Sequence, residues 1–166
     1  MSVEQQEKHQ IVTLVVESAS AHETKTWGRR LASLLTGGEL LGLIGELGAG
    51  KTCFIKGLAR GLGLREEEIL SPTFTMIQEH RGRLPLYHID LYRLETAMLD
   101  DMGLREYLFS EGIAAVEWFD RLREMPDLEF LEVRISYIGA HGRSIEFRGR
   151  GERHAAVVAR LKSGFA

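Results

Sequence analysis

The stretch Gly45-Glu46-Leu47-Gly48-Ala49-Gly50-Lys51-Thr52 decides the fold of this chain. It follows the pattern Gly, four residues, Gly-Lys-Ser/Thr, in which a glycine-rich turn and the start of the next helix aim backbone N–H groups at phosphate oxygens. The run Leu40–Ile44 before it is apolar, and residues 51–62 after it carry apolar side chains at three- and four-residue spacing. Strand, loop and helix therefore come in the order that a phosphate-binding loop requires, whereas an accidental glycine turn needs neither neighbour.

This loop predicts that the protein binds a nucleoside triphosphate. Glycines let the backbone approach the phosphates closely, Lys51 reaches the β- and γ-phosphates, and the hydroxyl of Thr52 is a ligand for Mg²⁺. Because Lys51 contacts the phosphate that is transferred, it is also a candidate catalytic residue. The candidate nucleotide-binding residues of the loop are Gly45, Leu47, Gly48, Ala49, Gly50, Lys51 and Thr52.

Hydrophobic patterns on either side of the loop predict alternating strands and helices. Leu40–Ile44 is apolar on both faces, as expected for a central parallel strand covered on both sides. Residues 131–137 alternate apolar and polar side chains, which is typical of a half-exposed antiparallel strand. The other predicted strands are 11–16, 73–79, 84–91, 113–116 and 144–148, with a hairpin turn at 80–83, and the predicted helices are 23–35, 51–62, 102–109 and 152–161.

These elements predict an α/β protein with the three-layer fold of P-loop NTPases, in which a mixed central sheet combines parallel core strands with antiparallel hairpins. Residues 1–10 are polar and are expected to form an N-terminal arm. Residues 11–166 are expected to form one P-loop ATPase domain, because 166 residues with 44% hydrophobic content suit a single core.

Two acidic residues stand at the ends of predicted strands and are candidates for the chemistry. Mg²⁺ bound to nucleotide phosphates needs one or two protein carboxylates, and Glu117 follows the buried run 113–116 as a metal-binding acid should. Asp90 ends the strand 84–91 and is a candidate to orient or deprotonate the attacking water, although it could equally cap a turn. His88 lies on the same side of that strand, but a histidine there is more often structural than catalytic, so we do not count it among the site residues.

Two further side chains are candidates for accessory roles. Trp118, next to Glu117, could stack on a ligand or simply pack in the core. Thr73 lies at a loop-to-strand junction, where a hydroxyl could sense the γ-phosphate as switch segments do; an ordinary strand threonine is the alternative.

Composition limits the classes of partner and compartment. The net charge of −3 does not suggest direct, tight binding to a nucleic-acid backbone, although a nucleic acid could be reached through partner proteins. The single cysteine, Cys53, fits a reducing compartment. No stretch approaches the roughly 20 apolar residues that span a bilayer, and the polar N-terminus lacks a signal-peptide core. We therefore expect a cytoplasmic protein without a membrane partner.

Motifs at four places in the chain resemble the TsaE family, also called YjeE. They are Gly-Glu-Leu-Gly-Ala-Gly-Lys-Thr at 45–52, Ser-Pro-Thr-Phe-Thr at 71–75, Tyr-His-Ile-Asp-Leu-Tyr-Arg-Leu at 87–94 and Val-Glu-Trp at 116–118. Members of that family are small bacterial ATPases required to make threonylcarbamoyladenosine beside the tRNA anticodon. The resemblance spans nearly the whole chain.

The resemblance implies roles for particular residues. Leu47–Thr52 would hold the ATP phosphates, Thr52 and Glu117 would hold Mg²⁺, and Asp90 would serve ATP hydrolysis. Arg143 matches an arginine that touches the nucleotide in relatives. The implied partners are TsaB and TsaD, of which the second transfers the threonylcarbamoyl group, so that tRNA is reached only through the complex.

Other functions remain open at this point. Small P-loop phosphotransferases share the loop, the magnesium chemistry and the size, but no arginine-rich lid segment is present. A GTPase is disfavoured because the guanine-reading Asn/Thr-Lys-x-Asp motif is missing. A binding subunit that ATP switches without appreciable hydrolysis is the non-enzymatic alternative.

Overall fold

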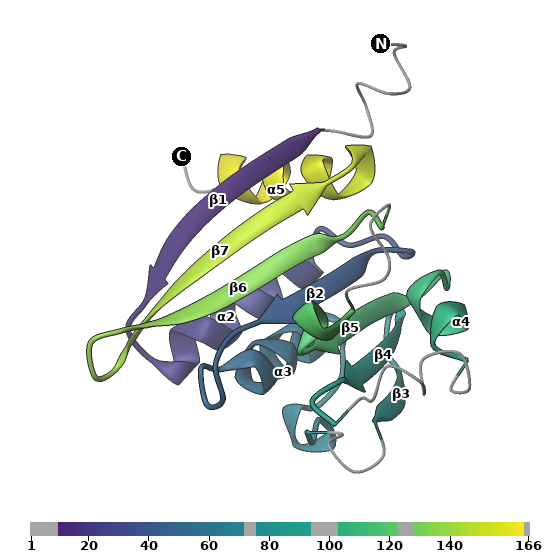
Figure 1. Ribbon diagram of the computed structural model, residues 1–166, viewed down its shortest axis with the longest axis horizontal. Helices are drawn as coiled ribbons and strands as arrows, with labels where there is room; N and C mark the ends of the chain where they lie inside the picture. Colours follow the sequence, from purple (N-terminus) through teal and green to yellow (C-terminus); the bar gives the residue numbers. More distant parts are fainter. Residues whose placement is uncertain (1–9, 72–75, 94–102, 123–127, 165–166) are drawn as a thin grey trace.

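The computed structural model describes residues 10–71, 76–93, 103–122 and 128–164, and these form one mixed β-sheet with helices packed against it (Figure 1). The strands are β1 (Ile11–Ser18), β2 (Leu40–Ile44), β3 (Ile77–Arg81), β4 (Pro85–Asp90), β5 (Ile113–Glu117), β6 (Leu131–Ile138) and β7 (Gly142–Arg150). The α-helices are α2 (Ala21–Ala32), α3 (Lys51–Gly61), α4 (Leu104–Leu108) and α5 (Glu152–Ser163), and the 3-10 turns are η1 (Glu66–Glu68) and η3 (Phe119–Arg121).

The sheet has the strand order β1-β7-β6-β2-β5-β4-β3. Strand β2 pairs in parallel with β5 on one side and β6 on the other, and β5 pairs in parallel with β4. The outer pairs β1–β7, β6–β7 and β3–β4 are antiparallel. The predicted α/β class, with parallel core strands and antiparallel hairpins, is confirmed.

Parallel pairing brings the carboxyl ends of β2, β5 and β4 to one edge of the sheet. The loop 45–52 leaves β2 at this edge, and the last residues of β4 and β5, Asp90 and Glu117, are register partners there. We refer to this side of the sheet as the loop edge. The topology therefore collects the loop and both candidate acids, which lie far apart in the sequence.

Two hydrophobic clusters cover the two faces of the sheet. The larger one lies under α2, α3 and α5, which stand together behind the sheet in Figure 1, and Phe147 of β7 is fully buried in it. Its ring centroid is 5.9 Å from those of both Trp27 on α2 and Phe54 on α3. The smaller cluster, on the other face, includes Leu104 and Leu108 of α4 and Phe119 of η3.

Helices α2 and α3 pack so closely that a side chain is excluded where they cross. A Cβ on Gly28 would lie 2.2 Å from the carbonyl oxygen of Phe54, and one on Gly57 would lie 2.0 Å from the carbonyl oxygen of Lys25. Both neighbours are backbone atoms, which cannot turn away as a side chain can. Because α3 begins at the loop, this contact holds the loop at a set position relative to α2.

Several predicted boundaries were wrong by a few residues. Helix α2 starts at Ala21 rather than at 23, because the side chain of Ser20 caps it and Glu23 bonds back to the N–H of Ala19 at 2.7 Å. It ends at Ala32 rather than at 35.

The hairpin and the helix near residue 104 also differ from the prediction. Strand β3 continues to Arg81, which pairs with Pro85, so the turn lies at 82–84 rather than at 80–83. Helix α4 covers only 104–108 of the predicted 102–109, and residue 102 lies outside the described part of the chain. No helix among the described residues is both long enough and apolar enough to cross a membrane.

Candidate functional site

The loop between β2 and α3 has the backbone geometry of a phosphate-binding turn. Gly48 and Gly50 have φ angles of 78° and 114°, a left-handed conformation that favours glycine. At Gly45 a Cβ would lie 2.6 Å from the carbonyl oxygen of Ile135 on β6, so the backbones can approach only without one. Helix α3 starts at Lys51 with no side-chain cap, and such a helix start leaves backbone N–H groups available to an anion.

Lys51 is buried at the start of α3 and is held by the loop itself. Its Nζ donates to the carbonyl oxygens of Gly45 at 2.6 Å and Glu46 at 2.9 Å, and lies 4.2 Å from the ring centroid of Trp118. Burial lowers the pKa of Lys51 from its ordinary value, while nearby carboxylates, above all Glu117, act in the opposite direction. The two carbonyl oxygens occupy two of the three N–H donors of the ammonium.

Glu117 is buried at the end of β5 and uses both of its carboxylate oxygens. Thr52 donates from Oγ1 to Oε1 at 2.8 Å, and Nε2 of His88 lies 2.6 Å from Oε2. The structure thus brings together the two predicted magnesium ligands, Thr52 and Glu117. His88, which was not counted among the candidate site residues, also contacts Glu117.

The predicted ligands suit Mg²⁺ chemically, because both are oxygen donors and their oxygens lie within 2.8 Å of each other. No cluster of three or more His, Cys, Asp or Glu side chains able to hold a metal occurs among the described residues. Mg²⁺ that binds a nucleotide usually takes one or two protein ligands together with substrate phosphates and water.

Asp90 lies beside Glu117 at the loop edge and is 4% exposed. Its Oδ1 accepts a hydrogen bond from the N–H of Tyr92 at 2.8 Å, and its Oδ2 accepts one from Ser71 Oγ at 3.3 Å. The turn-capping contact that the sequence left open is therefore present, and it fixes the orientation of a carboxylate that also lines the cavity described below.

Trp118 adopts a left-handed conformation with φ of 58° immediately after Glu117. Its ring packs against that of Tyr92, with centroids 4.9 Å apart, and against the ammonium of Lys51. The guanidinium of Arg121 lies 5.7 Å from the same ring. Trp118 therefore packs on other side chains and also lines the cavity. Its position is compatible both with a packing role and with stacking on a ligand.

The β6–β7 hairpin reaches the loop from the other side. Arg143 donates from Nε to the carbonyl oxygen of Ala49 at 2.9 Å, and Tyr137 donates from Oη to the carbonyl oxygen of Leu47 at 3.1 Å. Their side chains stack, with the guanidinium carbon 4.3 Å from the ring centroid. Arg143 thus contacts the backbone of the loop but is not among the residues that line the cavity, and its contact with a nucleotide stays a prediction.

Tyr137 was missed, because its place in the alternating strand 131–137 suggested an inward-facing core residue. It is instead 45% exposed, since the strand extends beyond the core at this end. No local pattern pointed to it, because Tyr137 and Arg143 are register partners across the hairpin and that pairing is seen only in the structure.

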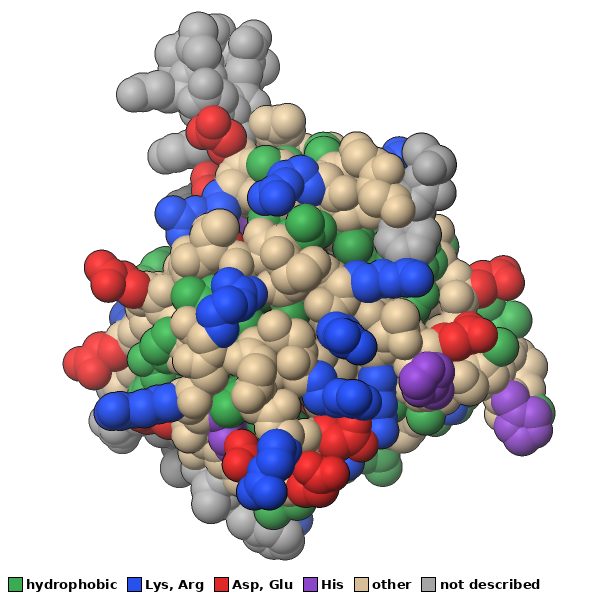
Figure 2. All heavy atoms as spheres, turned by 180° about the vertical axis from the view of Figure 1, so that it is seen from behind, with side chains coloured by type: hydrophobic (Ala, Val, Ile, Leu, Met, Phe, Trp, Pro, Cys, Tyr) green, Lys and Arg blue, Asp and Glu red, His purple; other side chains and the backbone are tan. Residues whose placement is uncertain are grey.

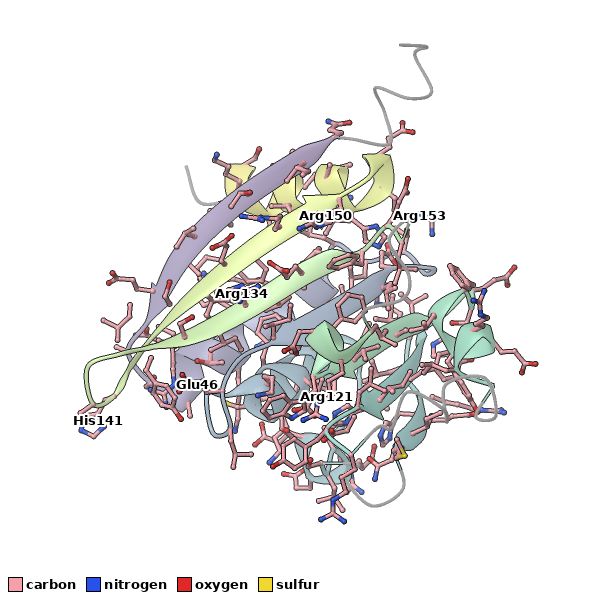
Figure 3. The ribbon with its side chains drawn as sticks, in the orientation of Figure 1. Glu46, Arg121, Arg134, His141, Arg150 and Arg153 are labelled. Carbon is pink, nitrogen blue, oxygen red and sulfur yellow. The ribbon has the colours of Figure 1, made fainter. Side chains whose placement is uncertain are left out.

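Most of the predicted site residues line one cavity of about 260 Å³ at the loop edge, whereas Gly45, Ala49 and Arg143 are not part of its lining. Figure 3 shows Glu46 and Arg121 toward this edge and Arg153 at the opposite one. Thr73 lies outside the described residues. The cavity is lined by Leu47, Gly48, Gly50, Lys51, Thr52, Cys53, Ser71, Asp90, Tyr92, Glu117 and Trp118.

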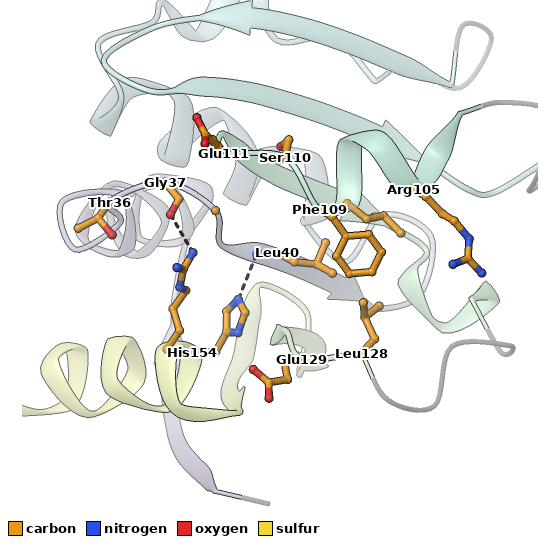
Figure 4. A pocket seen from close by; sticks show the side chains of 13 residues that line it. Thr36, Gly37, Leu40, Arg105, Phe109, Ser110, Glu111, Leu128, Glu129 and His154 are labelled. Atoms are coloured by element: carbon orange, nitrogen blue, oxygen red, sulfur yellow. Dashed lines mark hydrogen bonds between the residues drawn. The ribbon is translucent and has the colours of Figure 1, made fainter. Parts of the chain in front are cut away.

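A larger cavity of about 1000 Å³ lies at the opposite edge of the sheet and contains none of the predicted site residues (Figure 4). Its walls include Leu40 at the start of β2, Phe109 after α4, and His154 on α5. The backbone N–H of Leu40 donates to Nε2 of His154 at 3.1 Å. His154 is buried, and this burial lowers its pKa from 6.5 to about 4.

His154 predicts a loss of stability in acid. Its folded-state pKa of about 4 is below the unfolded value, so the unfolded chain binds the proton first as the pH falls. The stabilisation is complete above about pH 6.5 and is lost as the pH falls toward 4. A shift of this size corresponds to about 3 kcal/mol at 1.36 kcal/mol per pKa unit.

Urea unfolding of wild type and His154→Gln at about pH 7 and pH 4 measures this effect. The free energy of unfolding should fall by about 3 kcal/mol more in the wild type than in the variant, which has no histidine to protonate there. Equal losses in the two proteins would contradict the assignment.

The sequence matches known proteins over most of its length. The family model described as Threonylcarbamoyl adenosine biosynthesis protein TsaE matches residues 18–145. The chain is 47% identical over 114 residues to the tRNA threonylcarbamoyladenosine biosynthesis protein TsaE of Treponema pallidum (strain Nichols), which covers 66% of this chain and 82% of that relative. It is 40% identical over 145 residues to the protein of the same name from Bacillus subtilis (strain 168), covering 87% and 90%.

The fold also matches a solved structure. The crystal structure of Bacillus subtilis YdiB superposes with a TM-score of 0.81 and 34% sequence identity, covering 95% of this chain and 99% of that one. The agreement extends over the whole sheet and its helices, not only over the phosphate-binding loop.

Proposed function

We propose, because the chain belongs to the TsaE family of threonylcarbamoyl adenosine biosynthesis proteins, that it is the Mg²⁺-dependent ATPase of a complex that modifies adenosine beside the tRNA anticodon. The observation that carries the ATPase assignment is the meeting of Lys51, Thr52, Asp90 and Glu117 around one cavity at the loop edge. These side chains come from α3, β4 and β5, and they are the groups that phosphate binding, metal binding and water activation each need.

Phosphate binding falls to the loop. Its left-handed glycines and the uncapped start of α3 direct backbone N–H groups toward the β- and γ-phosphates of ATP. Lys51 moves from the carbonyl oxygens of Gly45 and Glu46 to the phosphates. Its hydrogen bonds to charged phosphate oxygens are stronger than those to carbonyl oxygens, which offsets the loss of the two contacts.

Thr52 and Glu117 would hold the metal ion, with their oxygens already adjacent. When bound there, Mg²⁺ would supply positive charge against the negative charge that develops on the phosphate oxygens. Asp90, the register partner of Glu117, orients the water that attacks the γ-phosphate and accepts its proton. The hydrogen bond from the N–H of Tyr92 holds the Asp90 carboxylate in place for this task.

The proposed partners are TsaB- and TsaD-like proteins, with tRNA contacted only through them. Supporting this, basic side chains on the helical face are spread out, with uncharged surface between them, rather than gathered into a stripe (Figure 2). Lys25 of α2 and Arg60 of α3 are paired with Glu66. Such a surface, on a chain of net charge −3, provides little electrostatic attraction for a phosphate backbone. We place the protein in the cytoplasm, where the tRNA that the complex modifies would be.

Phosphate release from ATP by the purified chain, alone and with TsaB and TsaD, tests the proposal. We expect slow release by the chain alone, faster release with both partners, and no release when EDTA removes Mg²⁺. Binding of ATP without release in the presence of both partners would identify a nucleotide-switched binding subunit instead. Stoichiometric conversion of ATP with a phosphorylated metabolite, unaffected by the partners, would identify a phosphotransferase.

A further inference from the structure

His88 is a fully buried side chain in direct contact with the proposed metal ligand Glu117. It lies on β4, two residues before Asp90, and its exposed fraction is 0%. Its Nε2 lies 2.6 Å from Oε2 of Glu117. We assign the hydrogen of this pair to Nε2, because a carboxylate that binds a metal ion must be ionised and an ionised carboxylate only accepts hydrogen bonds.

The contact completes a clamp on the Glu117 carboxylate. Thr52 donates to one carboxylate oxygen and His88 to the other, from α3 and β4 respectively. With a donor on each oxygen, the carboxylate cannot rotate about its terminal bond without breaking a hydrogen bond. Each oxygen has a second lone-pair site, so the clamp leaves the carboxylate able to accept a further ligand.

Only one of the two donors belongs to the proposed metal site itself. The Thr52 hydroxyl would be a ligand for Mg²⁺, and its oxygen must then be shared with the ion. His88 is fully buried and is not among the residues that line the cavity, so its hydrogen bond to Glu117 need not be shared with a ligand there. Groups that orient metal ligands in this way commonly contribute 10- to 100-fold to metal affinity or activity.

We propose that His88 is a positioning residue that holds the Glu117 carboxylate in the orientation that binds Mg²⁺. The proposal rests on the proposed function, since it takes Thr52 and Glu117 as the magnesium ligands. His88 itself touches neither ATP nor the metal. Its effect should therefore appear in metal-dependent nucleotide binding and not in nucleotide binding as such.

Calorimetric titration of the full chain with a non-hydrolysable ATP analogue, in saturating Mg²⁺ and in EDTA, tests the role of His88. The ratio of the two affinities is the gain that Mg²⁺ provides. In His88→Ala this gain should fall roughly 10- to 100-fold, while the affinity in EDTA stays at the wild-type value. His88→Gln should recover most of the gain, because its amide nitrogen can reach the position of Nε2 and still donate.

The matched control is His154→Gln, which changes a second buried histidine at the opposite edge of the sheet. This variant should keep the full Mg²⁺ gain even if its stability falls. Thermal unfolding followed by circular dichroism confirms that each variant is folded.

The possible failures can be told apart. A wild-type protein without any gain from Mg²⁺ overturns the assignment of Thr52 and Glu117, and the role of His88 with it. A wild-type gain that His88→Ala retains overturns the role of His88 alone. An equal loss of affinity in Mg²⁺ and EDTA, or a His88→Gln variant as weak as His88→Ala, shows a structural histidine rather than a positioning one.

Discussion

Asp90→Asn should lower the rate of ATP hydrolysis by roughly 10²–10⁴-fold, the usual contribution of a positioned acid or base. Asparagine has nearly the same shape, and its side-chain oxygen can still accept the hydrogen bond from the N–H of Tyr92. What it loses is the negative charge and the ability to take a proton from the attacking water. Affinity for ATP should therefore change little, and the effect should fall on turnover.

The measurement is single-turnover phosphate release, with ATP affinity determined separately by calorimetry. Asp120→Asn is the matched control, since Asp120 also lies near Lys51 but is exposed to solvent. It removes the same charge near the loop edge and should leave turnover within a few-fold of the wild type. If Asp90→Asn hydrolyses ATP as fast as this control, Asp90 does not act on the water.

Phe147→Ala should lower the free energy of unfolding by about 3–5 kcal/mol, the cost typical of removing a fully buried phenylalanine. The ring lies between α2 and α3 and touches an aromatic ring on each, so its removal opens a cavity where three elements meet. A loss of this size is a large part of the roughly 5–15 kcal/mol that stabilises a typical domain. The position of α3, and with it the phosphate-binding loop, depends on the same packing.

Guanidinium unfolding followed by circular dichroism measures the change in stability. Phe109→Ala serves as the control because it is the same substitution at a residue that is 62% exposed. That variant should stay within about 0.5 kcal/mol of the wild type, as surface substitutions usually do. Similar losses in both variants would contradict the central place of Phe147 in the core.

Local patterns were enough to predict most of the secondary structure. The apolar run 40–44 became the central parallel strand β2, and the alternating segment 131–137 became β6. The errors lay at element ends, where a single contact shifts a boundary. Helix α2 starts two residues early because Ser20 caps it, a signal that the sequence carried but that periodicity does not measure.

The candidate site residues also divide into those that a local pattern identifies and those that depend on tertiary contacts. Lys51 and Thr52 could be identified from one continuous motif, and Asp90 and Glu117 from acids that end predicted strands. His88 could not be assigned in this way. Its role depends on which strand lies beside β4, and the sequence did not determine strand order.

The sequence by itself determined the glycine-rich loop 45–52, its flanking strand and helix, and the residue types that the candidate site contains, because these depend on neighbours within a few positions. Only the tertiary structure decided which of these side chains touch. His88 meets Glu117 across 29 residues, and Tyr137 meets Leu47 across 90. Such contacts depend on strand order and register, which are determined by packing of the whole sheet against its helices rather than by any local pattern.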